Sequence, residues 1–410
     1  MNLTDSLSLN SQLTEPLDAR TQSVMYSVSP TSGEDLAIAL LEAAQKRRTM
    51  SVVGSGTKRL MGGPALPAEV TVCTGGLKRI VEYEPNDLTI SVEAGHSFSD
   101  LQEVLARRGQ MIALDPPFYA KATVGGIVAS NSNGPMRRAF GTARDLVIGM
   151  KFAMLNGKVA SVGGMVVKNV AGLDIGKLMV GSFGTLGVIT TVNFRLHSLP
   201  EDTNTFLYSF PDLESALEKR DAVLRSPLHP LAIDLVSPPA AARLGASGYL
   251  VAIRAGGSKL VMRRYERELS RCDRLAGNDE RAWWAHLREF PADFVRRQPN
   301  GVVLRIGTTL SDMGMLLCSI SGAFISRAAA GVTYVYLSSW QGVPVFWESA
   351  VKNRWSAAIE FAPNESRSTK DLWLLRSMGK SDSSFAMMKK IKQMFDPNNL
   401  LNRSRLYGRL

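Results

Sequence analysis

Hydrophobic and polar positions follow two different periods in the first half of the chain. Behind Ser32, a suitable N-cap, Leu36, Leu40 and Ala44 recur at helical spacing and predict a helix that ends near Arg48. Short apolar, β-branched runs between turn residues predict strands instead, at 50–53, 70–72, 77–81 and 88–92. A second helix is expected over 99–108. This alternation of short strands and helices continues to about residue 196.

The pattern changes after Leu199 and Pro200, where glycine becomes less frequent and helical periods lengthen. We expect helices over 213–225, 260–269 and 312–320, and strands over 232–236, 248–254, 302–306 and 332–337. This succession predicts a separate α+β domain with helices on one face of an antiparallel sheet. A last helix is expected over 387–394.

These changes divide the 410 residues into four regions. Residues 1–22 are polar and rich in Ser and Thr, and we expect a flexible leader there. A glycine-rich domain follows over 23–199, then the α+β domain over 200–380 and a C-terminal segment over 381–410. The leader shows no signal-peptide or transit-peptide pattern, and no apolar run approaches the length of a membrane span. We therefore expect a cytoplasmic protein without a transmembrane segment.

Charge and cysteine content exclude several classes of function. The net charge is +11, from 48 Lys and Arg against 37 Asp and Glu. The basic residues are scattered and no recognition motif accompanies them, so we expect no nucleic-acid partner. The three cysteines include no C-x-x-C pair. A disulfide framework, a zinc site and an iron–sulfur cluster made by this chain alone are therefore not expected.

Glycine is concentrated between residues 122 and 196, most closely at Gly125-Gly126 and around Gly181 and Gly187. Glycine lets the backbone adopt positive φ and approach a ligand closely. So many glycines in one stretch indicate backbone wrapped around a large, flat ligand. The alternative, a glycine-rich domain of turns and strands with no ligand, remains open on these residues alone.

The first expected strand runs directly into Gly54-Ser55-Gly56-Thr57-Lys58. Glycines leave successive N–H groups free to point at phosphate oxygens, and hydroxyls add donors. The spacing matches neither the Walker loop G-x-x-x-x-G-K-[ST] nor the dinucleotide fingerprint G-x-G-x-x-G. The turn therefore suits an anion, with a simple surface turn as the alternative.

Together these residues resemble the FAD-binding domain of the vanillyl-alcohol oxidase/p-cresol methylhydroxylase superfamily. The turn at 54–57 looks like the first pyrophosphate loop, 123–134 looks like the second flavin loop, and 181–190 is the strongest match. The tail 395–402 resembles the closing F-D-P-x-x-x-L-N motif. The resemblance implies that FAD is held by Gly54, Ser55, Gly56, Thr57, Lys58, Pro116, Thr123, Gly125, Gly126, Ser130, Asn131, Gly134, Gly181, Ser182, Gly187, Val188 and Ile189.

Within the superfamily, residues 168–174 leading into 178–182 resemble the E subunit of glycolate oxidase (glycolate dehydrogenase). This implies an α+β fold, with a two-subdomain FAD-binding domain over 23–199 and a smaller ferredoxin-like α+β cap over 200–380. The segment 381–410 would return to the FAD-binding domain. The implied partners are a catalytic flavoprotein D-like subunit and an iron–sulfur F-like subunit, through which the chain would associate peripherally with the inner face of the membrane.

The resemblance also implies what chemistry the chain performs. Some relatives attach the flavin to a His or Cys near the first loop, but that loop offers only Ser55, Thr57 and Lys58, so FAD is expected to be non-covalent. None of the four histidines forms an H-x-x-H pair, and we expect no metal site. Phe183 stands where catalytic relatives carry the glutamate of G-S-E-G-T. Catalytic residues therefore stay unassigned, and we expect a part in 2-hydroxy-acid oxidation through electron transfer or assembly.

Two other functions remain open. In the first, the chain is a stand-alone FAD-dependent 2-hydroxy-acid dehydrogenase. In the second, it is a non-redox scaffold whose flavin site is empty. Arg137, Arg138 and Lys168 are candidate cations for a substrate, or simply solvated surface residues. The tryptophans of the α+β domain belong either to a partner interface or to its core; they are Trp283, Trp284, Trp340, Trp347 and Trp355.

Overall fold

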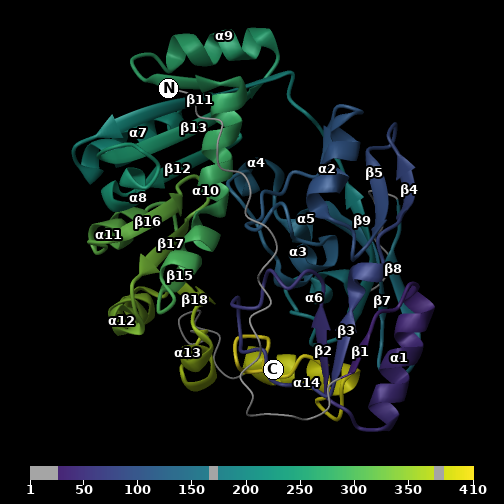
Figure 1. The fold of residues 1–410 in the computed structure, drawn as a ribbon. Helices are drawn as coiled ribbons and strands as arrows, with labels where there is room; N and C mark the ends of the chain where they lie inside the picture. The colour runs from purple at the N-terminus through teal and green to yellow at the C-terminus, as the bar shows by residue number, and fades with distance from the viewer. Residues whose placement is uncertain (1–25, 166–173, 374–382) are drawn as a thin grey trace, which may run out of the picture.

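The computed structural model describes residues 26–165, 174–373 and 383–410. A first domain, residues 26–198, is built on two main sheets and lies on the right in Figure 1. The cap, from residue 202 to residue 361, is built on one large sheet and lies on the left. Two features expected from the sequence lie outside the described residues. They are the leader and residues 168–173 of the motif at 168–174, which include Lys168.

The small sheet of the first domain is parallel and is packed against α1 (Gly33–Gln45). Its order is β1–β3–β2, with β1 at Tyr26–Val28, β2 at Met50–Val53 and β3 at Val70–Cys73. A short 3-10 helix, η1 (Thr74–Gly76), follows β3. Ser32 caps α1 by accepting the Asp35 N–H at 3.0 Å, and the apolar face that its spacing predicted is buried.

The larger sheet of the first domain is antiparallel, in the order β4–β5–β9–β7–β8. Its strands are β4 (Ile80–Glu84), β5 (Thr89–Glu93), β7 (Val147–Ala153), β8 (Val159–Gly163) and β9 (Val188–Arg195). A two-stranded ribbon pairs β6 (Gln110–Met111) with β10 (His197–Ser198). The helices of this part are α2 (Phe98–Ala106), α3 (Val124–Ser130), α4 (Arg137–Phe140), α5 (Ala143–Leu146) and α6 (Gly176–Met179). Helix α3 packs on β5 and β9, which places its glycine-rich start at the end of the sheet.

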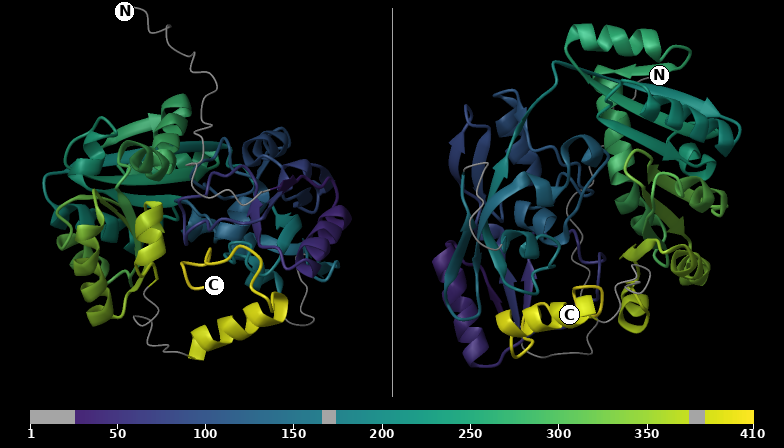
Figure 2. Two further views of the ribbon diagram at one scale, coloured as in Figure 1. Left: turned by 60° about the horizontal axis from the view of Figure 1, so that its bottom comes forward. Right: turned by 180° about the vertical axis from the view of Figure 1, so that it is seen from behind.

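The C-terminal segment returns to the first domain. Helix α14 (Ser383–Phe395) lies at the lower end of that domain in Figures 1 and 2, close to the small sheet. After the helix, Leu401 forms a parallel bridge with Met50 of β2. Leu400 and Leu401 join the same hydrophobic cluster as the buried face of α1, so the last residues complete the core of the small sheet.

The cap sheet is antiparallel throughout, in the order β14–β11–β13–β12–β16–β17–β15–β18. Its strands are β11 (Asp202–Phe210), β12 (Ala232–Val236), β13 (Tyr249–Gly257), β14 (Asp273–Ala276), β15 (Val302–Gly307), β16 (Ala323–Arg327), β17 (Val332–Leu337) and β18 (Ser356–Phe361). With eight strands this sheet is larger than either main sheet of the first domain. The long apolar strands after residue 200 allow a wide sheet with a core of its own.

The cap is built from two halves with the same order of strands and main helices. Each half runs strand, helix, strand, strand, helix, strand; the first half has in addition the short helix α8 between its second and third strands, and the second half has η2 before its second helix. The two halves meet where β12 pairs with β16. The helices of the cap are α7 (Leu213–Arg225), α8 (Pro238–Ala242), α9 (Lys259–Glu268), α10 (Gly277–Arg297), α11 (Met313–Cys318), η2 (Trp340–Gly342), α12 (Val343–Asn353) and α13 (Asn364–Thr369). Helix α10 joins the halves. Its position between the cap sheet and the first domain, visible in Figure 1, makes it part of their interface.

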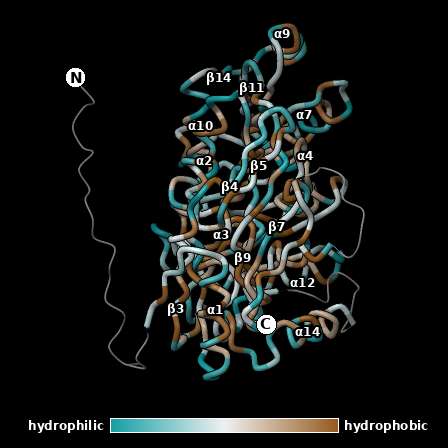
Figure 3. Tube along the Cα trace, turned by 90° about the vertical axis from the view of Figure 1, so that its right-hand side faces the viewer, coloured by the Kyte–Doolittle hydropathy of each residue, from teal (hydrophilic) through white to brown (hydrophobic). Residues whose placement is uncertain are grey.

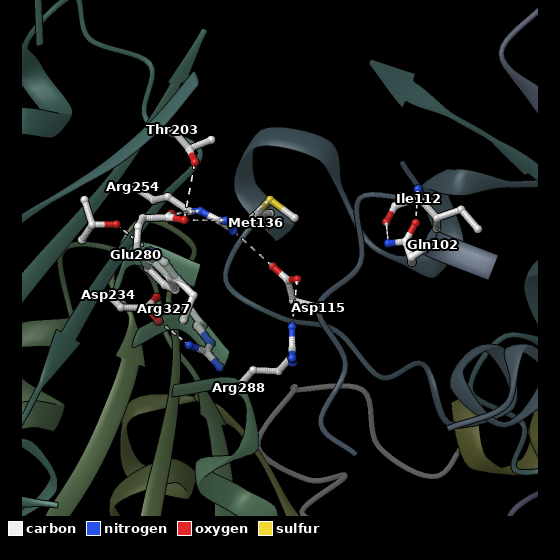
Figure 4. Close-up of polar contacts among 12 residues, drawn as sticks. Gln102, Ile112, Asp115, Met136, Thr203, Asp234, Arg254, Glu280, Arg288 and Arg327 are labelled. Atoms are coloured by element: carbon white, nitrogen blue, oxygen red, sulfur yellow. Dashed lines mark hydrogen bonds and ion pairs between the residues drawn. The ribbon is translucent and has the colours of Figure 1, made fainter. Parts of the chain in front are cut away.

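Charged side chains connect the cap to the first domain. On α10, the Glu289 carboxylate accepts the backbone N–H of Phe118 at 2.8 Å. Nearby, Asp115 of the first domain lies 3.8 Å from Arg254 and 4.0 Å from Arg288, both of the cap, as Figure 4 shows. The loop around 115–118 is therefore held by the cap on two sides.

Hydrophobic stretches are short and alternate with hydrophilic ones along the chain, as the tube in Figure 3 shows. Among the described residues, no helix is both long and apolar enough to cross a membrane. Trp284 and Trp355 are buried in the cap core, and the other three tryptophans pack partly buried against it. The core therefore accounts for the tryptophan-rich composition of the cap.

Candidate functional site

A pocket of about 320 Å³ opens in the first domain, beside the end of β2. Three glycine-rich segments converge on it: the turn after β2, the start of α3 and the segment that leads into β9. The expected cofactor residues that line it are Gly54, Ser55, Gly56, Thr57, Lys58, Thr123, Gly125, Gly126, Ser130, Gly187, Val188 and Ile189. Segments up to 135 residues apart in the sequence thus form one binding surface.

The turn after β2 presents free backbone donors. Among the described residues, the N–H groups of residues 55–58 have no hydrogen-bond acceptor. Gly56 has φ of +75°, and a Cβ on Gly54 would lie 2.4 Å from Thr123 Oγ1. The Thr123 hydroxyl oxygen in turn accepts the Gly126 N–H at 3.3 Å, capping α3. Successive free N–H groups in a turn with positive φ form a concave site for an anion.

The wall beside this turn is flat because its residues are small. Gly125 donates its N–H to the Ala94 carbonyl at 2.7 Å, and a Cβ on Gly125 would lie 2.7 Å from the Ala94 Cβ. Ala94 and Ala129 line the pocket together with Gly126. Glycine is therefore required at position 125 for α3 to pack against the end of β5.

Lys58 is the one lysine in the pocket lining. Its Nζ donates to the Pro117 carbonyl at 2.6 Å and lies 4.8 Å from the centre of the Phe118 ring. Burial lowers the pKa of Lys58 to about 7, although the carboxylates of Glu289 and Glu360 oppose that shift. Near neutral pH the side chain can therefore be charged or neutral, and an anion bound in the pocket favours the charged form.

The C-terminal segment contributes residues that the sequence analysis did not assign to the site. Asn402 and Arg405 line the pocket, and so does Phe183. Asn402 donates from Nδ2 to the Phe183 carbonyl at 2.7 Å and accepts the Val52 N–H at Oδ1 at 2.8 Å. The signal for Asn402 was the terminal asparagine of the F-D-P-x-x-x-L-N motif. Arg405, and the residues of 65–68 that also line the pocket, carry no comparable signal.

Some expected cofactor residues lie outside the pocket lining; they are Pro116, Asn131, Gly134, Gly181 and Ser182. They shape the loops around it. Gly181, with φ of +79°, donates its N–H to the Val128 carbonyl at 3.0 Å, and a Cβ on Gly134 would lie 2.3 Å from the Asp115 carbonyl oxygen. The glycines at 134 and 181 therefore serve close backbone packing.

Within the three described ranges, no group of three or more His, Cys, Asp or Glu could hold a metal ion. The His197 ring packs 4.7 Å from Phe140, and burial together with Arg195 lowers the pKa of His197. His96 donates from Nδ1 to the Ser97 carbonyl at 2.8 Å. Neither ring lines the pocket.

Two domain models match the chain at the segments that form the pocket. A model described as an FAD binding domain matches residues 25–163, and one described as the C-terminal domain of FAD linked oxidases matches residues 369–406. The chain thus contains an FAD binding domain. The first match contains the turn at 54–58 and the start of α3, and the second contains Asn402 and Arg405.

Curated relatives of this chain include subunits of glycolate oxidase. The chain is 37% identical over 172 residues to glycolate oxidase subunit GlcE of Escherichia coli (strain K12), which covers 40% of the chain and 48% of the relative. It is 26% identical over 212 residues to glycolate oxidase subunit GlcD of Bacillus subtilis (strain 168), covering 52% and 45%. It is 30% identical over 211 residues to D-lactate dehydrogenase of Archaeoglobus fulgidus, covering 51% and 46%. The chain thus matches about half the length of these relatives.

Solved structures share the fold across both domains. The chain has a TM-score of 0.71 with p-cresol methylhydroxylase with substrate bound, at 15% identity, covering 93% of this chain and 88% of the other. With the isoeugenol complex of 4-ethylphenol oxidase from Gulosibacter chungangensis the TM-score is 0.69, at 14% identity, covering 95% and 91%. These neighbours confirm the expected type of fold, a mixed fold of helices and sheets with a p-cresol-methylhydroxylase-type FAD-binding domain.

The residues present fit FAD. A dinucleotide with a pyrophosphate needs several backbone donors, which residues 55–58 supply, and a flat ring system needs a small-residue wall, which Ala94, Gly126 and Ala129 supply. The pocket contains no carboxylate in its lining, and Lys58 and Arg405 add positive charge. An anionic cofactor is therefore favoured electrostatically.

Proposed function

We propose that this chain is an FAD-binding subunit of a glycolate oxidase (dehydrogenase) complex. The complex oxidises glycolate and other 2-hydroxy acids to 2-oxo acids. In it this chain serves electron transfer or assembly and is not the main catalytic subunit. The partners in this proposal are a catalytic flavoprotein similar to GlcD and an iron–sulfur subunit. The complex acts in the cytoplasm, at the inner face of the membrane.

The observation that carries this proposal is the residue at position 183. Phe183 lies in the pocket lining, where an apolar ring 5.5 Å from the Tyr407 ring cannot take or give a proton. Oxidation of a hydroxy acid at a flavin requires a base for the hydroxyl proton. In the described ranges no metal-binding group supplies an alternative, which supports a role in binding FAD without the main chemistry.

The cofactor is held without a covalent bond in this proposal, because none of the described residues that line the pocket is a His or Cys. We assign the pyrophosphate to the N–H groups of residues 55–58 and the start of α3, and the remaining contacts to 187–189 and Asn402. Bound FAD supplies the capacity to accept and pass on two electrons. The side chains of this chain hold it, exclude water and, through Lys58, set the charge beside it.

The domain organisation follows from the same proposal. The chain comprises a leader at 1–22, the FAD-binding domain at 23–199, the cap at 200–380 and a C-terminal segment at 381–410 that returns to the FAD-binding domain. We further propose that each half of the cap is a ferredoxin-like unit. The element order β-α-β-β-α-β in each half supports this, and so do the strand orders β14–β11–β13–β12 and β16–β17–β15–β18.

The test combines flavin analysis with reconstitution. The purified chain is expected to carry flavin that acid or heat releases, and glycolate alone is expected to leave its visible spectrum unchanged under anaerobic conditions. Turnover with glycolate is expected only when a GlcD-like subunit and an iron–sulfur subunit are added, and to be lost when this chain is omitted. Bleaching of the isolated chain by glycolate or lactate would instead establish a stand-alone dehydrogenase.

The stand-alone dehydrogenase is the second candidate. It is favoured by the D-lactate dehydrogenases among the relatives, at 30% identity for the protein of Archaeoglobus fulgidus. A chain that purifies without flavin, and that cannot be loaded with FAD, would contradict both redox functions. The non-redox scaffold would then be the remaining function.

A further inference from the structure

A cluster of charged and phenolic side chains occupies the cap face that meets the first domain. Arg305 of β15 stands opposite Tyr334 of β17 in the strand register. Arg327 of β16 lies with its guanidinium carbon 5.6 Å from the centre of the Tyr334 ring. Glu360 of β18 is the neighbour of Arg305 on the other side. Four adjacent strands thus place one side chain each in the same region.

The first domain adds a fifth member, Arg137 of α4. Burial lowers the pKa of Arg137, and the charges of Arg305 and Arg327 lower it further, so the three guanidinium groups lie within electrostatic reach of one another. The same three cations oppose the burial that raises the pKa of Tyr334. The phenol ring thus lies beside Arg327 and opposite Arg305, and the charge of Arg137 acts on it from the first domain.

The carboxylates of the cluster do not balance its cations. Arg305 donates from Nε to Glu360 at 2.9 Å, and Arg327 forms a buried ion pair with Asp234, which Figure 4 shows on the same face. Among the described residues Arg137 has no ion-pair partner, and the buried Nε of Arg327 has no hydrogen-bond acceptor. Three guanidinium groups and two carboxylates leave one positive charge without a counter-ion.

The cluster is accessible at Arg305 and Arg137 and is separate from the pyrophosphate turn. The Arg305 side chain is 32% exposed and Arg137 is partly buried, whereas Tyr334 and Arg327 are 9% and 6% exposed. None of these residues lines the cofactor pocket. They adjoin it through Tyr407, whose hydroxyl accepts from Arg305 at 3.4 Å and whose ring packs on Phe183.

We propose that Arg137, Arg305, Arg327 and Tyr334 bind a small carboxylate anion in this chain itself. A single surplus positive charge matches a monoanion, guanidinium groups bind carboxylates through paired N–H donors, and the phenol hydroxyl adds a donor. Glycolate, the 2-hydroxy acid of the proposed function, is such a monoanion. The site goes beyond the proposed function, because it gives this subunit a ligand of its own whichever subunit oxidises that ligand.

The chain offers a matched control for each key residue. Arg138 is next to Arg137 on α4, but it is exposed and donates to the Ala329 carbonyl at 2.9 Å. Tyr265 of α9 is also a buried tyrosine of the cap, and no member of the cluster acts on it. Arg137→Gln and Tyr334→Phe test the site, and Arg138→Gln and Tyr265→Phe test for general effects of losing a charge or a hydroxyl.

The experiment titrates the FAD-loaded full chain with glycolate and, separately, with inorganic phosphate, by calorimetry under anaerobic conditions. Glycolate is expected to bind the wild type and both control variants equally. Loss of a charge-assisted hydrogen bond should weaken binding by about tenfold or more in Arg137→Gln, and loss of a neutral one by about threefold or more in Tyr334→Phe. The melting temperature and flavin content report folding; if Arg137→Gln does not fold, Tyr334→Phe decides.

Several outcomes would overturn the proposal. These are no binding of glycolate by the wild type, unchanged binding by Tyr334→Phe and Arg137→Gln, equal loss in the controls, or tighter binding of phosphate than of glycolate. Loss of flavin from a folded Arg137→Gln protein would assign the cluster to the cofactor and also overturn it. Failure of the proposed function gives a different result, since the chain would then bind glycolate but be dispensable for turnover by the complex.

Discussion

The amide of Asn402 is hydrogen-bonded to the carbonyl of Phe183 at 2.7 Å, so a residue near the C-terminus fixes the segment that leads into β9. The same side chain accepts the N–H of Val52 at 2.8 Å, at the end of β2. Two walls of the cofactor pocket are therefore joined through one side chain that is 350 residues away from one of them.

Replacing this asparagine should loosen both walls together. Asn402→Ala leaves a buried carbonyl and a partly buried N–H without partners, which should lower the free energy of unfolding by about 1–3 kcal/mol. Flavin should also be lost more readily on dilution. Asn398→Ala, at an exposed position in the same segment, is the control. Urea denaturation and flavin fluorescence of the filtrate measure the two effects, and equal behaviour of both variants would contradict the role of Asn402.

The three glycines at positions 54, 126 and 75 should differ in their tolerance of alanine. A Cβ at Gly54 would lie 2.4 Å from Thr123 Oγ1, a Cβ at Gly126 would lie 3.1 Å from the same atom, and a Cβ at Gly75 would meet nothing within 4 Å. FAD retention should therefore decrease most in Gly54→Ala, less in Gly126→Ala and not at all in Gly75→Ala. The bound flavin per protein after gel filtration is the measurement. Any other order would show that the turn moves freely to accommodate a side chain.

FAD affinity should depend on pH through Lys58. Because burial lowers the pKa of Lys58 to about 7, the free protein loses this positive charge as the pH rises through that value. An anionic cofactor favours the ammonium form, so binding takes up a proton above pH 7 and becomes weaker as the pH rises. Calorimetry in two buffers of different ionisation enthalpy measures the uptake.

The Lys58→Met variant isolates this effect. It should bind FAD more weakly than wild type at pH 6 and approach wild-type affinity at pH 9, with no proton uptake in this range from residue 58. Lys121→Met, at an exposed position, should keep the wild-type profile. A Lys58→Met profile parallel to that of wild type would assign the pH dependence to another group.

At position 183, a glycine variant should be more stable than an alanine variant, which is the reverse of the usual order. Phe183 has φ of +53°, in the left-handed region that costs an L-residue roughly 1–2 kcal/mol and glycine very little. Both Phe183→Ala and Phe183→Gly delete the ring that packs on Tyr407, so their difference reports the backbone alone. Phe183→Gly should be more stable by about 1 kcal/mol in urea denaturation. A less stable glycine variant would mean that the loop relaxes when the ring is removed.

The pocket could be predicted from the sequence where backbone chemistry requires a particular residue. Gly54, Gly125 and the capping Thr123 each occupy a position at which a larger or apolar residue would clash or leave a donor unpaired. Arg405 was missed because arginine is common on surfaces, and only the folded chain brings it beside the turn at 54–58. Local sequence does not reveal which distant residues come together in the folded chain.

In the cap, too, some features could be predicted from the sequence and others could not. The helix at 213–225 was predicted with its observed ends, because Asp212 caps it and its apolar period is regular. The pairing of β12 with β16 could not be predicted, since the strands are separated by 86 residues and both are apolar. Nor did the sequence show a repeat, although the two halves of the cap have the same order of strands and helices.

The pairing of β12 with β16 has a consequence for attempts to shorten this protein. Among the described residues, three residue pairs make up the strand register between β12 and β16, with Asp234 opposite Arg327 as one of them. A chain cut before β15 would retain a complete first half but expose β12 as an unpaired edge, together with the buried carboxylate of Asp234. Open edges of this kind add strands from other molecules. A truncated form with half a cap is therefore a candidate for self-association, whereas removal of the whole cap leaves no open edge in that sheet.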